Sequence, residues 1–263
     1  MPRLLNALAH RVLPLALLAG LAGCYSVPVT GRKALSLVDD KEVTKMSIAA
    51  FEDMKSHYPI SHDPERIAQL QRVGERLEHV IPWWDMGDAD WEFVVFDVPE
   101  INAFAMAGGK VGVFTGLFKV VQNDDQLAAV LGHEIAHVTA RHVQERLSRE
   151  MAKETLGVVV SPIMAMQSAS GATRGDLAFD RDKENEADHI GMIYMASAGY
   201  DPHEAIKVLE RLDEVTGAQM TIPTFLSNHP PTPERIQALT EELPKAMEVY
   251  EKSLHPEAPT VIK

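Results

Sequence analysis

Hydrophobic positions recur with a helical period along most of the chain. Apolar residues spaced three or four positions apart form a stripe in each such segment, and acidic residues, threonine or proline stand where the helices begin. These signals predict helices over 39–57, 63–80, 123–150, 182–198 and 201–215, and a last helix from 232 onwards. The chain is therefore expected to be mainly α-helical.

A different pattern occupies the region between the second and third predicted helices. Aromatic and β-branched residues dominate 91–98, 101–106 and 111–114, and Gly108 and Gly109 separate the last two runs. We interpret these runs as a small antiparallel sheet, which makes the fold α+β. Residues 39–263 are expected to form one domain, since single catalytic domains often reach this length.

The first 24 residues have the features of an export signal. Arg3 and Arg11 precede the apolar run 12–23, and small residues stand just before Cys24, the single cysteine of the chain. This arrangement predicts a signal peptide over 1–23, because the run is too short to span a bilayer. Leu-Ala-Gly-Cys resembles the bacterial lipobox, in which the cysteine becomes lipidated. The alternative is an ordinary signal peptide that happens to precede a cysteine.

Two other segments lack a clear core pattern. Residues 24–38 contain Pro28 and Gly31 and are expected to be the lipidated N-terminus and a tether to the domain. Residues 155–172 are apolar and rich in methionine and small residues. They predict a mobile helix and loop near a site, with a role that the sequence leaves open.

Composition and charge narrow the range of partners. The chain has 263 residues, of which 46% are hydrophobic, and this content excludes a disordered protein. Its formal net charge is −13, which argues against binding to nucleic acid. Removal of 1–23 would delete two positive charges and no negative ones, leaving −15. We therefore expect membrane attachment to depend on acyl chains at Cys24.

The sequence His133-Glu134-Ile135-Ala136-His137 lies inside the helix predicted over 123–150. Four residues turn a helix by about 400°, so both imidazoles lie on one face and can bind one metal ion. Imidazole is a preferred ligand of zinc, and Glu134 lies beside the pair as a candidate general base. The alternative is a chance match on an ordinary helix.

Two histidines do not complete a catalytic zinc site, which usually has three protein ligands and a water molecule. His142 is one position out of register with the metzincin pattern, and Glu145 lies about 12 Å of helical rise beyond His137. A thermolysin-like spacing fits poorly, because Leu156 and Gly157 stand where a glutamate is needed. The third ligand is therefore expected from another helix.

Glu184 and Asp188 provide that ligand on the helix predicted over 182–198. At a spacing of four, one carboxylate can bind zinc while the other accepts a hydrogen bond from the outer nitrogen of a ligand histidine. Glu186 is expected to point elsewhere. The alternative is a solvated acidic helix face.

With these motifs the chain resembles the HtpX, Oma and CAAX-prenyl-protease zinc metallopeptidases, metallopeptidase family forty-eight, and within them the periplasmic lipoproteins of the LoiP type. The resemblance covers nearly the whole mature chain. It rests on Asn102-Ala103-Phe104-Ala105, Gly108-Gly109, Thr115-Gly116-Leu117, Val130-Leu131-Gly132-His133-Glu134, His137-Val138, Arg141-His142, Glu184 to Asp188, Ala198-Gly199-Tyr200-Asp201-Pro202 and His229-Pro230. One departure is Met106-Ala107, where relatives commonly have Leu-Pro.

The resemblance implies a zincin-type domain with a glutamate as the third ligand and one zinc ion per chain. In this sequence it implies His133, His137 and Glu184 as ligands, Glu134 as the base, and Asp188 as the partner of a ligand histidine. By resemblance to other lipoproteins, a residue other than aspartate after Cys24 implies the periplasmic face of the outer membrane.

His229 stands in the proline-rich loop 227–231. By resemblance it approaches the metal, where it either stabilises the oxyanion of the intermediate or occupies the open zinc position at rest. The alternative is a surface histidine. Arg235 is a candidate for orienting this loop, or an exposed helix arginine, and His142 is expected to be structural rather than a ligand.

The segment 102–113 could offer a sheet edge to which an extended peptide adds as a strand. Asn102, Ala103 and Phe104 are the candidate substrate-binding residues. The expected function is a zinc-dependent endopeptidase of the bacterial cell envelope. Its implied substrates are misfolded or unassembled envelope proteins, and other envelope quality-control proteins are further candidate partners.

Two rival functions stay open. One is a latent chaperone-like or binding factor in which His229 or the segment 155–175 blocks the zinc site. The other is a zinc hydrolase that does not act on peptides, which a peptide-binding edge disfavours.

Overall fold

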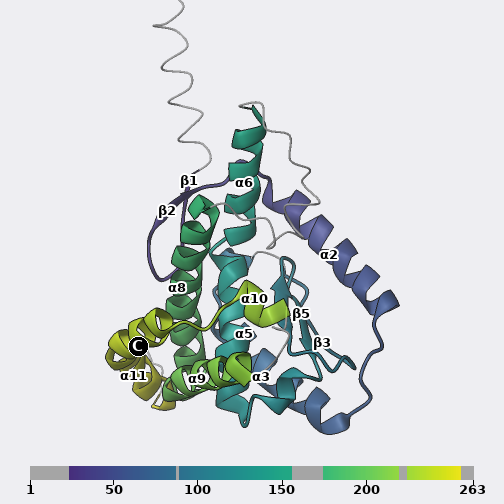
Figure 1. Ribbon diagram of the computed structural model, residues 1–263, viewed down its shortest axis with the longest axis vertical. Coiled ribbons are helices and arrows are strands. Elements are labelled where there is room, and N and C mark those ends of the chain that lie inside the picture. Colours follow the sequence, from purple (N-terminus) through teal and green to yellow (C-terminus); the bar gives the residue numbers. More distant parts are fainter. Residues whose placement is uncertain (1–23, 87–88, 156–173, 219–223, 256–263) are drawn as a thin grey trace, which may run out of the picture.

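The computed structural model describes residues 24–86, 89–155, 174–218 and 224–255 (Figure 1). The helices are α2 (Asp40–His57), α3 (Pro64–Val80), α4 (Trp83–Met86), α5 (Asp124–Thr139), α6 (His142–Thr155), α8 (Arg174–Ser197), α9 (His203–Ala218), α10 (Thr224–Asn228) and α11 (Pro233–Leu254), with a 3-10 turn, η1 (Leu117–Lys119). The strands are β1 (Cys24–Ser26), β2 (Lys33–Leu35), β3 (Glu92–Phe96), β4 (Ala103–Met106) and β5 (Lys110–Phe114). The fold is mainly helical with little sheet, as the hydrophobic pattern predicts.

Four of the long helices begin at residues whose side chains cap them. Each cap accepts a hydrogen bond from backbone N–H groups of the first turn, which have no partner inside the helix. The caps are Asp39, Asp63, Asn123 and Thr232, at the starts of α2, α3, α5 and α11. The predicted starts of these helices therefore agree closely with the structure.

The helix predicted over 123–150 is two helices. α5 ends at Thr139 and α6 begins at His142, because Arg141 adopts a left-handed conformation with φ of 56°. The guanidinium of Arg141 lies 2.6 Å from a carboxylate oxygen of Asp40 and over the ring of Tyr25. The break brings the imidazole of His142 beside that of His137, instead of carrying it away along one continuous helix.

The central sheet is mixed, where the sequence pattern predicted an antiparallel one. Its strand order is β3–β5–β4, and β5 runs parallel to β3 and antiparallel to β4. β4 and β5 form a hairpin through Gly108 and Gly109, whose φ values of 86° and 78° are unstrained only for glycine. The hairpin inserts β5 between β3 and β4, which a reading of the strands in chain order does not foresee.

The sheet lies between α2 on one side and α3 and α5 on the other. The ring of Phe104 on β4 packs with Phe51 of α2 and with Phe114 of β5. Ala103 alternates with it and belongs to the main core around α5. Because side chains alternate along a strand, β4 places small residues against α5 and its large ring on the opposite face.

Helix α5 is the central element of the core. Leu127, Leu131 and Ile135 are fully buried, and the helix packs against α3, α8, α9 and β4. Its approach to α8 is close because glycines face each other across the contact. A Cβ atom on Gly191 would lie 2.7 Å from the backbone nitrogen of His133, and one on Gly132 would lie 2.8 Å from the carbonyl oxygen of Gly191.

Residues 24–35 form a β-hairpin that packs on the domain, although the sequence pattern predicted a tether there. β1 pairs with β2, with Cys24 opposite Leu35, and Val27 is buried. The side chain of Arg32 contacts Glu145 of α6 and Glu186 of α8. These partners lie more than 100 positions away, so no local pattern indicates them. We call residues 24–35 the N-terminal hairpin.

None of the helices within the described ranges is both long and apolar enough to cross a membrane. The predicted signal peptide, 1–23, lies outside the described residues. So does nearly all of the apolar segment 155–172.

Candidate metal centre

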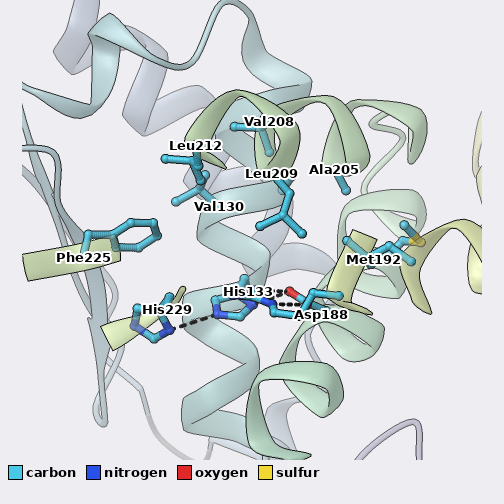
Figure 2. Close-up of a pocket in the computed structure, with 13 residues that line it drawn as sticks. Val130, His133, Asp188, Met192, Ala205, Val208, Leu209, Leu212, Phe225 and His229 are labelled. Atoms are coloured by element: carbon cyan, nitrogen blue, oxygen red, sulfur yellow. Dashed lines mark hydrogen bonds and ion pairs between the residues drawn. The ribbon is translucent and has the colours of Figure 1, made fainter. Parts of the chain in front are cut away.

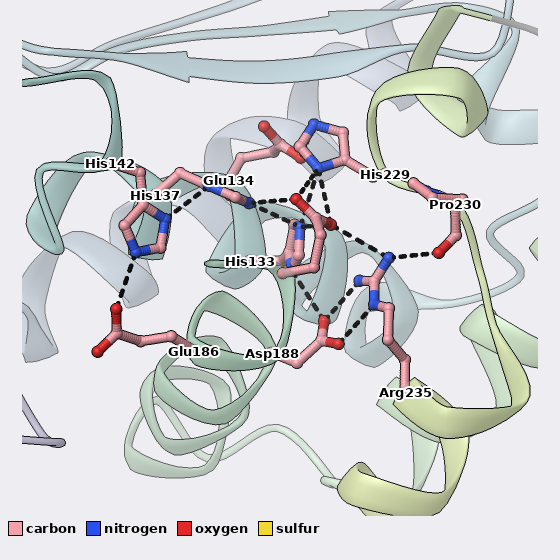
Figure 3. Close-up of polar contacts among 10 residues, drawn as sticks. His133, Glu134, His137, His142, Glu186, Asp188, His229, Pro230 and Arg235 are labelled. Atoms are coloured by element: carbon pink, nitrogen blue, oxygen red, sulfur yellow. Dashed lines mark hydrogen bonds and ion pairs between the residues drawn. The ribbon is translucent and has the colours of Figure 1, made fainter. Parts of the chain in front are cut away.

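Helices α5 and α8 bring two imidazoles and one carboxylate together (Figure 3). The Nε2 atoms of His133 and His137 lie 3.0 Å apart. One oxygen of Glu184 lies 3.3 Å from Nε2 of His133, and the other lies 3.3 Å from Nε2 of His137. Together with His229, these residues offer one ligand atom each, all within 4.8 Å of one another.

The outer nitrogen of His133 fixes the proton arrangement of this cluster. Its Nδ1 donates to Asp188 over 2.8 Å, so Nε2 is the nitrogen that points into the cluster and is available to a metal. Asp188 in turn accepts two hydrogen bonds of 2.7 Å from Arg235 of α11. Both residues of this pair are buried, and the bidentate geometry holds the carboxylate in one orientation.

Arg235 also fixes the loop that carries His229. Its Nη1 donates to the carbonyl of Pro230 over 3.0 Å and lies 3.1 Å from a carboxylate oxygen of Glu184. Arg235 is only 6% exposed, so it is not a solvated helix arginine. Arg235 thus connects the last helix and the loop that carries His229 to the carboxylates of Glu184 and Asp188.

His229 lies inside the cluster rather than on the surface. Its Nδ1 is 3.0 and 3.1 Å from the two oxygens of Glu184 and 3.2 Å from Nε2 of His133. Its backbone N–H donates to the carbonyl of Phe225, whose ring it contacts. Although burial lowers the pKa of His229, the charges of Glu134 and Glu184 outweigh this effect and raise it.

Glu134 is a buried carboxylate at the margin of the cluster. Its Oε1 has no hydrogen-bond partner, and the nearest cation is Nε2 of His229, 3.7 Å away. Burial raises the pKa of Glu134. A buried oxygen that accepts no hydrogen bond costs free energy unless a ligand or a water molecule satisfies it, so this atom is suited to hold a water.

The two candidate ligand histidines differ in their affinity for a proton. Burial opposes protonation of His133, but Glu184 and Asp188 outweigh it and raise the pKa of His133 to about 10. For His137, burial dominates and places the pKa well below its ordinary value.

The donor set fits zinc. Two imidazole nitrogens and a carboxylate are common ligands of catalytic zinc. The two Nε2 atoms lie 3.0 Å apart, so the extra proton of His133 is shared with His137, and a metal cation that replaced this proton would bind both nitrogens. These residues could therefore hold the metal that the sequence motif implies.

His142 and Glu186 lie on the outer side of His137. The Nδ1 of His142 is 2.9 Å from Nδ1 of His137, and its Nε2 is 3.1 Å from Glu186. Glu186 points away from the cluster, as its position on the helix predicts. The sequence did not predict that Glu186 would contact His142 behind His137. The break at Arg141, which places His142 beside His137, has no local sequence signal.

β4 is an edge strand next to α5, but it presents its backbone differently from the prediction. Asn102 accepts a hydrogen bond from Phe114 of β5, and in an antiparallel ladder the bonded positions alternate. Phe104 therefore also faces β5, whereas the N–H and C=O groups of Ala103 and Ala105 face away from it. Of the three predicted substrate-binding residues, only Ala103 has its backbone groups on the outer edge.

A small apolar cavity adjoins the cluster (Figure 2). His133, Asp188 and His229 form its polar side. Its apolar wall comes mainly from α5, α9 and α10, with contributions from α8 and α11, and Figure 2 shows Val130, Val208, Leu209, Leu212 and Phe225 around it. The cavity offers an apolar surface directly beside the candidate metal centre.

Gly191 is a further residue that positions the site and that sequence reasoning missed. With Gly132 it lets α8 approach α5 closely enough for Glu184 to reach both histidines. A glycine inside a predicted helix is the signal that could have identified it, since glycine there needs a packing reason.

The fold and the site together define a metallohydrolase, with two histidines on one helix, a carboxylate from a second helix and a buried glutamate. Comparison with known proteins identifies the family. Residues 64–243 match the model of peptidase family M48. This chain belongs to peptidase family M48 and is a metallopeptidase.

Several characterised proteins are similar to it. Mitochondrial metalloendopeptidase OMA1 of Schizosaccharomyces pombe is 33% identical over 238 residues, which are 86% of this chain and 68% of the relative. The Saccharomyces cerevisiae protein of the same name is 36% identical over 62% of this chain and 50% of its own length. The beta-barrel assembly-enhancing protease of Escherichia coli is 28% identical over 78% of this chain. The chain spans less than half, 44%, of that last relative.

Proposed function

We propose that this protein is a zinc-dependent endopeptidase of the bacterial cell envelope that hydrolyses misfolded or unassembled envelope proteins. The observation that carries the proposal is the convergence of three ligand residues beside a buried carboxylate oxygen that has no hydrogen-bond partner. Membership of a metallopeptidase family supports the reaction. The envelope location is supported by the predicted export signal and by the similarity to a protease named for β-barrel assembly.

The geometry supports a role for each residue. His133, His137 and Glu184 would hold one zinc ion per chain. When bound, the metal polarises the scissile carbonyl and lowers the pKa of water. Glu134 takes a proton from the attacking water and passes it to the leaving amine. Asp188 holds His133 in the tautomer whose Nε2 faces the metal.

An extended substrate adds as a strand along β4. Ala103 and Ala105 offer outward N–H and C=O groups, which recognise a peptide backbone without demanding particular side chains. The small cavity lined by Leu209 and Phe225 offers apolar contact to a substrate side chain near the scissile bond. Unfolded proteins meet both requirements, since they expose backbone and apolar residues together.

His229 has two candidate roles in this site. Its Nε2 side faces Glu134, and from there it can donate a hydrogen bond to the developing oxyanion. Its Nδ1 also lies close enough to Glu184 and His133 to fill the fourth position around the metal. That second arrangement favours the alternative function, a latent chaperone-like or binding factor, because a site with four protein ligands is closed to substrate.

Cys24 is the proposed lipid attachment site, and 24–263 the proposed mature chain. A Cys24→Ala variant is expected to leave the membrane fraction, because the acidic domain has little attraction for anionic lipid. Continued membrane association of this variant in cell fractionation would contradict the proposal.

Glu134→Gln tests the enzymatic function. The change removes the base but no ligand, so the variant should bind one zinc ion, unfold at an unchanged temperature and lose cleavage of a dye-labelled unfolded protein. Zinc content and cleavage are measured on the same preparations. A Glu134→Gln variant that cleaves normally would refute the mechanism. A zinc-loaded unchanged protein that binds the unfolded protein without cleaving it would favour the latent factor.

A further inference from the structure

The two ligand histidines do not have the same kind of outer partner. His133 donates directly to a carboxylate, whereas Nδ1 of His137 lies 2.9 Å from Nδ1 of a second imidazole, that of His142. Nε2 of His142 lies 3.1 Å from Oε2 of Glu186 (Figure 3). The side chains of His142 and Glu186 are 6% and 8% exposed. A buried line of contacts therefore runs from α8 through α6 to the metal centre.

One arrangement of protons satisfies every atom of this line. His137 must keep the lone pair of Nε2 to bind a metal, so its proton lies on Nδ1 and is donated to His142. Nδ1 of His142 is then the acceptor, and its own proton lies on Nε2. That proton is donated to Glu186, a carboxylate that can only accept. The position of the carboxylate thus determines the tautomer of His142 and, through it, that of His137.

The N-terminal hairpin holds the carboxylate in place. Nε of Arg32 lies 2.8 and 2.9 Å from the two oxygens of Glu186, and the hydroxyl of Thr30 donates to Oε1 over 2.9 Å. Nζ of Lys183 is also near, at 3.7 Å. These contacts leave Glu186 one orientation in which Oε2 faces His142.

The same hairpin fixes the helix that carries His142. Nη2 of Arg32 lies 2.6 Å from Glu145 of α6, and the hydroxyl of Tyr25 donates to Glu145 over 3.0 Å. The single hydrogen of that hydroxyl is shared with the carbonyl of Ala140, at the break between α5 and α6. Both ends of the line behind His137 are therefore tied to residues 24–35.

A role limited to packing explains only part of this arrangement. Two cations, Arg32 and Lys183, face two carboxylates, Glu145 and Glu186, and such a balanced cluster could simply close the hairpin onto the domain. It would not require His142, whose two nitrogens are both used and one of which faces a candidate metal ligand. The imidazole connects the charge cluster to the metal centre.

We propose that Glu186 and His142 are positioning residues of the metal centre, which fix the tautomer and ring orientation of His137, and that Arg32 of the N-terminal hairpin holds Glu186 for this purpose. The inference rests on the proposed metal site. It assigns the hairpin a part in building the site. Partners of this kind typically change metal affinity by about 10- to 100-fold.

Zinc affinity of the full chain tests the proposal. Dissociation constants are measured by competition with a chromogenic chelator for His142→Phe, Glu186→Ala and Arg32→Ala, with Asp182→Ala as the control because it removes an exposed carboxylate from the same helix. We expect about 10- to 100-fold weaker binding for the first two variants. Arg32→Ala should lose less zinc affinity, since Thr30 and Lys183 still contact Glu186. The Asp182→Ala control should bind zinc as tightly as the wild-type protein.

Two further measurements separate positioning from folding. Glu186→Gln keeps an acceptor oxygen in the same volume, so its zinc affinity should lie between those of Glu186→Ala and the unchanged protein. Nitrogen NMR of the zinc-loaded unchanged protein reads the tautomers directly. The proton of His137 is expected on Nδ1 and that of His142 on Nε2, with the His142 assignment lost in Glu186→Ala.

The outcomes distinguish this inference from the proposed function. Normal zinc affinity in folded His142→Phe and Glu186→Ala, or a proton on Nδ1 of His142, would overturn the positioning role. Normal affinity in Arg32→Ala alone would overturn the part assigned to the hairpin. An unchanged protein that binds no zinc would instead overturn the proposed metal site itself.

Discussion

The two candidate ligand histidines, His133 and His137, are supported from opposite ends of the chain. Behind His133 stand Asp188 and Arg235, a buried ion pair whose arginine comes from the last helix. Behind His137 stand His142 and Glu186, and the cation that holds Glu186 is Arg32, whose side chain is 35% exposed. One support is thus entirely internal, and the other reaches the surface at the N-terminal hairpin.

This difference predicts how each support responds to its surroundings. An ion pair near solvent is weakened by salt and contributes little when isolated, whereas breaking a buried pair leaves an uncompensated charge. The Asp188–Arg235 pair behind His133 should therefore respond little to salt, whereas mutation of either residue should have a large effect. The His137 side should be the one that salt, or a change at the hairpin, can modulate.

Loss of Glu184 should have the largest effect, because this carboxylate contacts both histidines. Glu184→Ala is expected to reduce the zinc content from one ion per chain to nearly none after gel filtration, measured by elemental analysis. Glu186→Ala should still be loaded at saturating zinc. Equal losses in the two variants would show that the ligand on α8 is wrongly assigned.

His229 gives the next largest effect, and its sign decides between the two proposed roles. If His229 donates to the oxyanion, His229→Ala should lower turnover by roughly 10²- to 10³-fold with little change in zinc affinity. If it occupies the fourth metal position, the same change should raise basal cleavage, because substrate no longer competes with an imidazole on a short loop. Turnover and zinc content are measured together. If neither turnover nor zinc content changed, His229 would have no role in catalysis or in metal binding.

Matched amide substitutions compare the two supports directly. Asp188→Asn removes the carboxylate that accepts two hydrogen bonds from the buried guanidinium of Arg235 and leaves it Glu184 as its anionic partner. The change should therefore lower the free energy of unfolding by up to about 3 kcal/mol and weaken zinc binding by up to about 100-fold. Glu186→Gln should lower the free energy of unfolding and the zinc affinity by less, since Arg32 is partly exposed to solvent. Thermal unfolding and chelator competition measure the two effects. Similar losses in both variants would remove the distinction between an internal and a surface support.

His133, His137, Glu184 and Asp188, the candidate site residues that the sequence identified by spacing, share the property of regular spacing on a helix. His133 and His137 are four positions apart, as are Glu184 and Asp188, and such spacing determines which side chains share a face. Arg32 has no such relation to Glu186, because the contact joins segments 154 positions apart.

The secondary structure shows the same difference between features that local sequence signals predict and features that depend on distant contacts. Helices with clear caps, such as α2 and α3, were predicted nearly to the residue, because caps are local. The break at Arg141 and the insertion of β5 between β3 and β4 were missed. Both depend on contacts with distant segments: Arg141 is held by Asp40 and Tyr25, and β5 needs β3 as its parallel neighbour.

A last expected effect concerns the protons that zinc displaces. In the metal-free protein, burial opposes protonation of His133, but Glu184 and Asp188 raise its pKa to about 10, while burial keeps the pKa of His137 well below its ordinary value. Zinc must therefore displace a proton from His133 and none from His137. Zinc affinity should rise about tenfold for each pH unit between pH 7 and pH 9, since the free ligand becomes steadily more available.

The pKa shift of His133 also makes folding stability depend on pH. In the metal-free chain the stabilisation from protonated His133 is complete below its unfolded pKa of about 6.5 and is lost as the pH rises through about 10.

Two variants serve as controls for the pH dependence of zinc binding. Asp188→Asn removes one of the two charges that raise the pKa of His133, so the zinc affinity of this variant should level off at a lower pH. Glu186→Gln should keep the slope of the unchanged protein, because Glu186 acts on the other histidine. Chelator competition at pH 7, 8 and 9 measures all three proteins, and an identical pH profile in the two variants would mean that the supports are not separate.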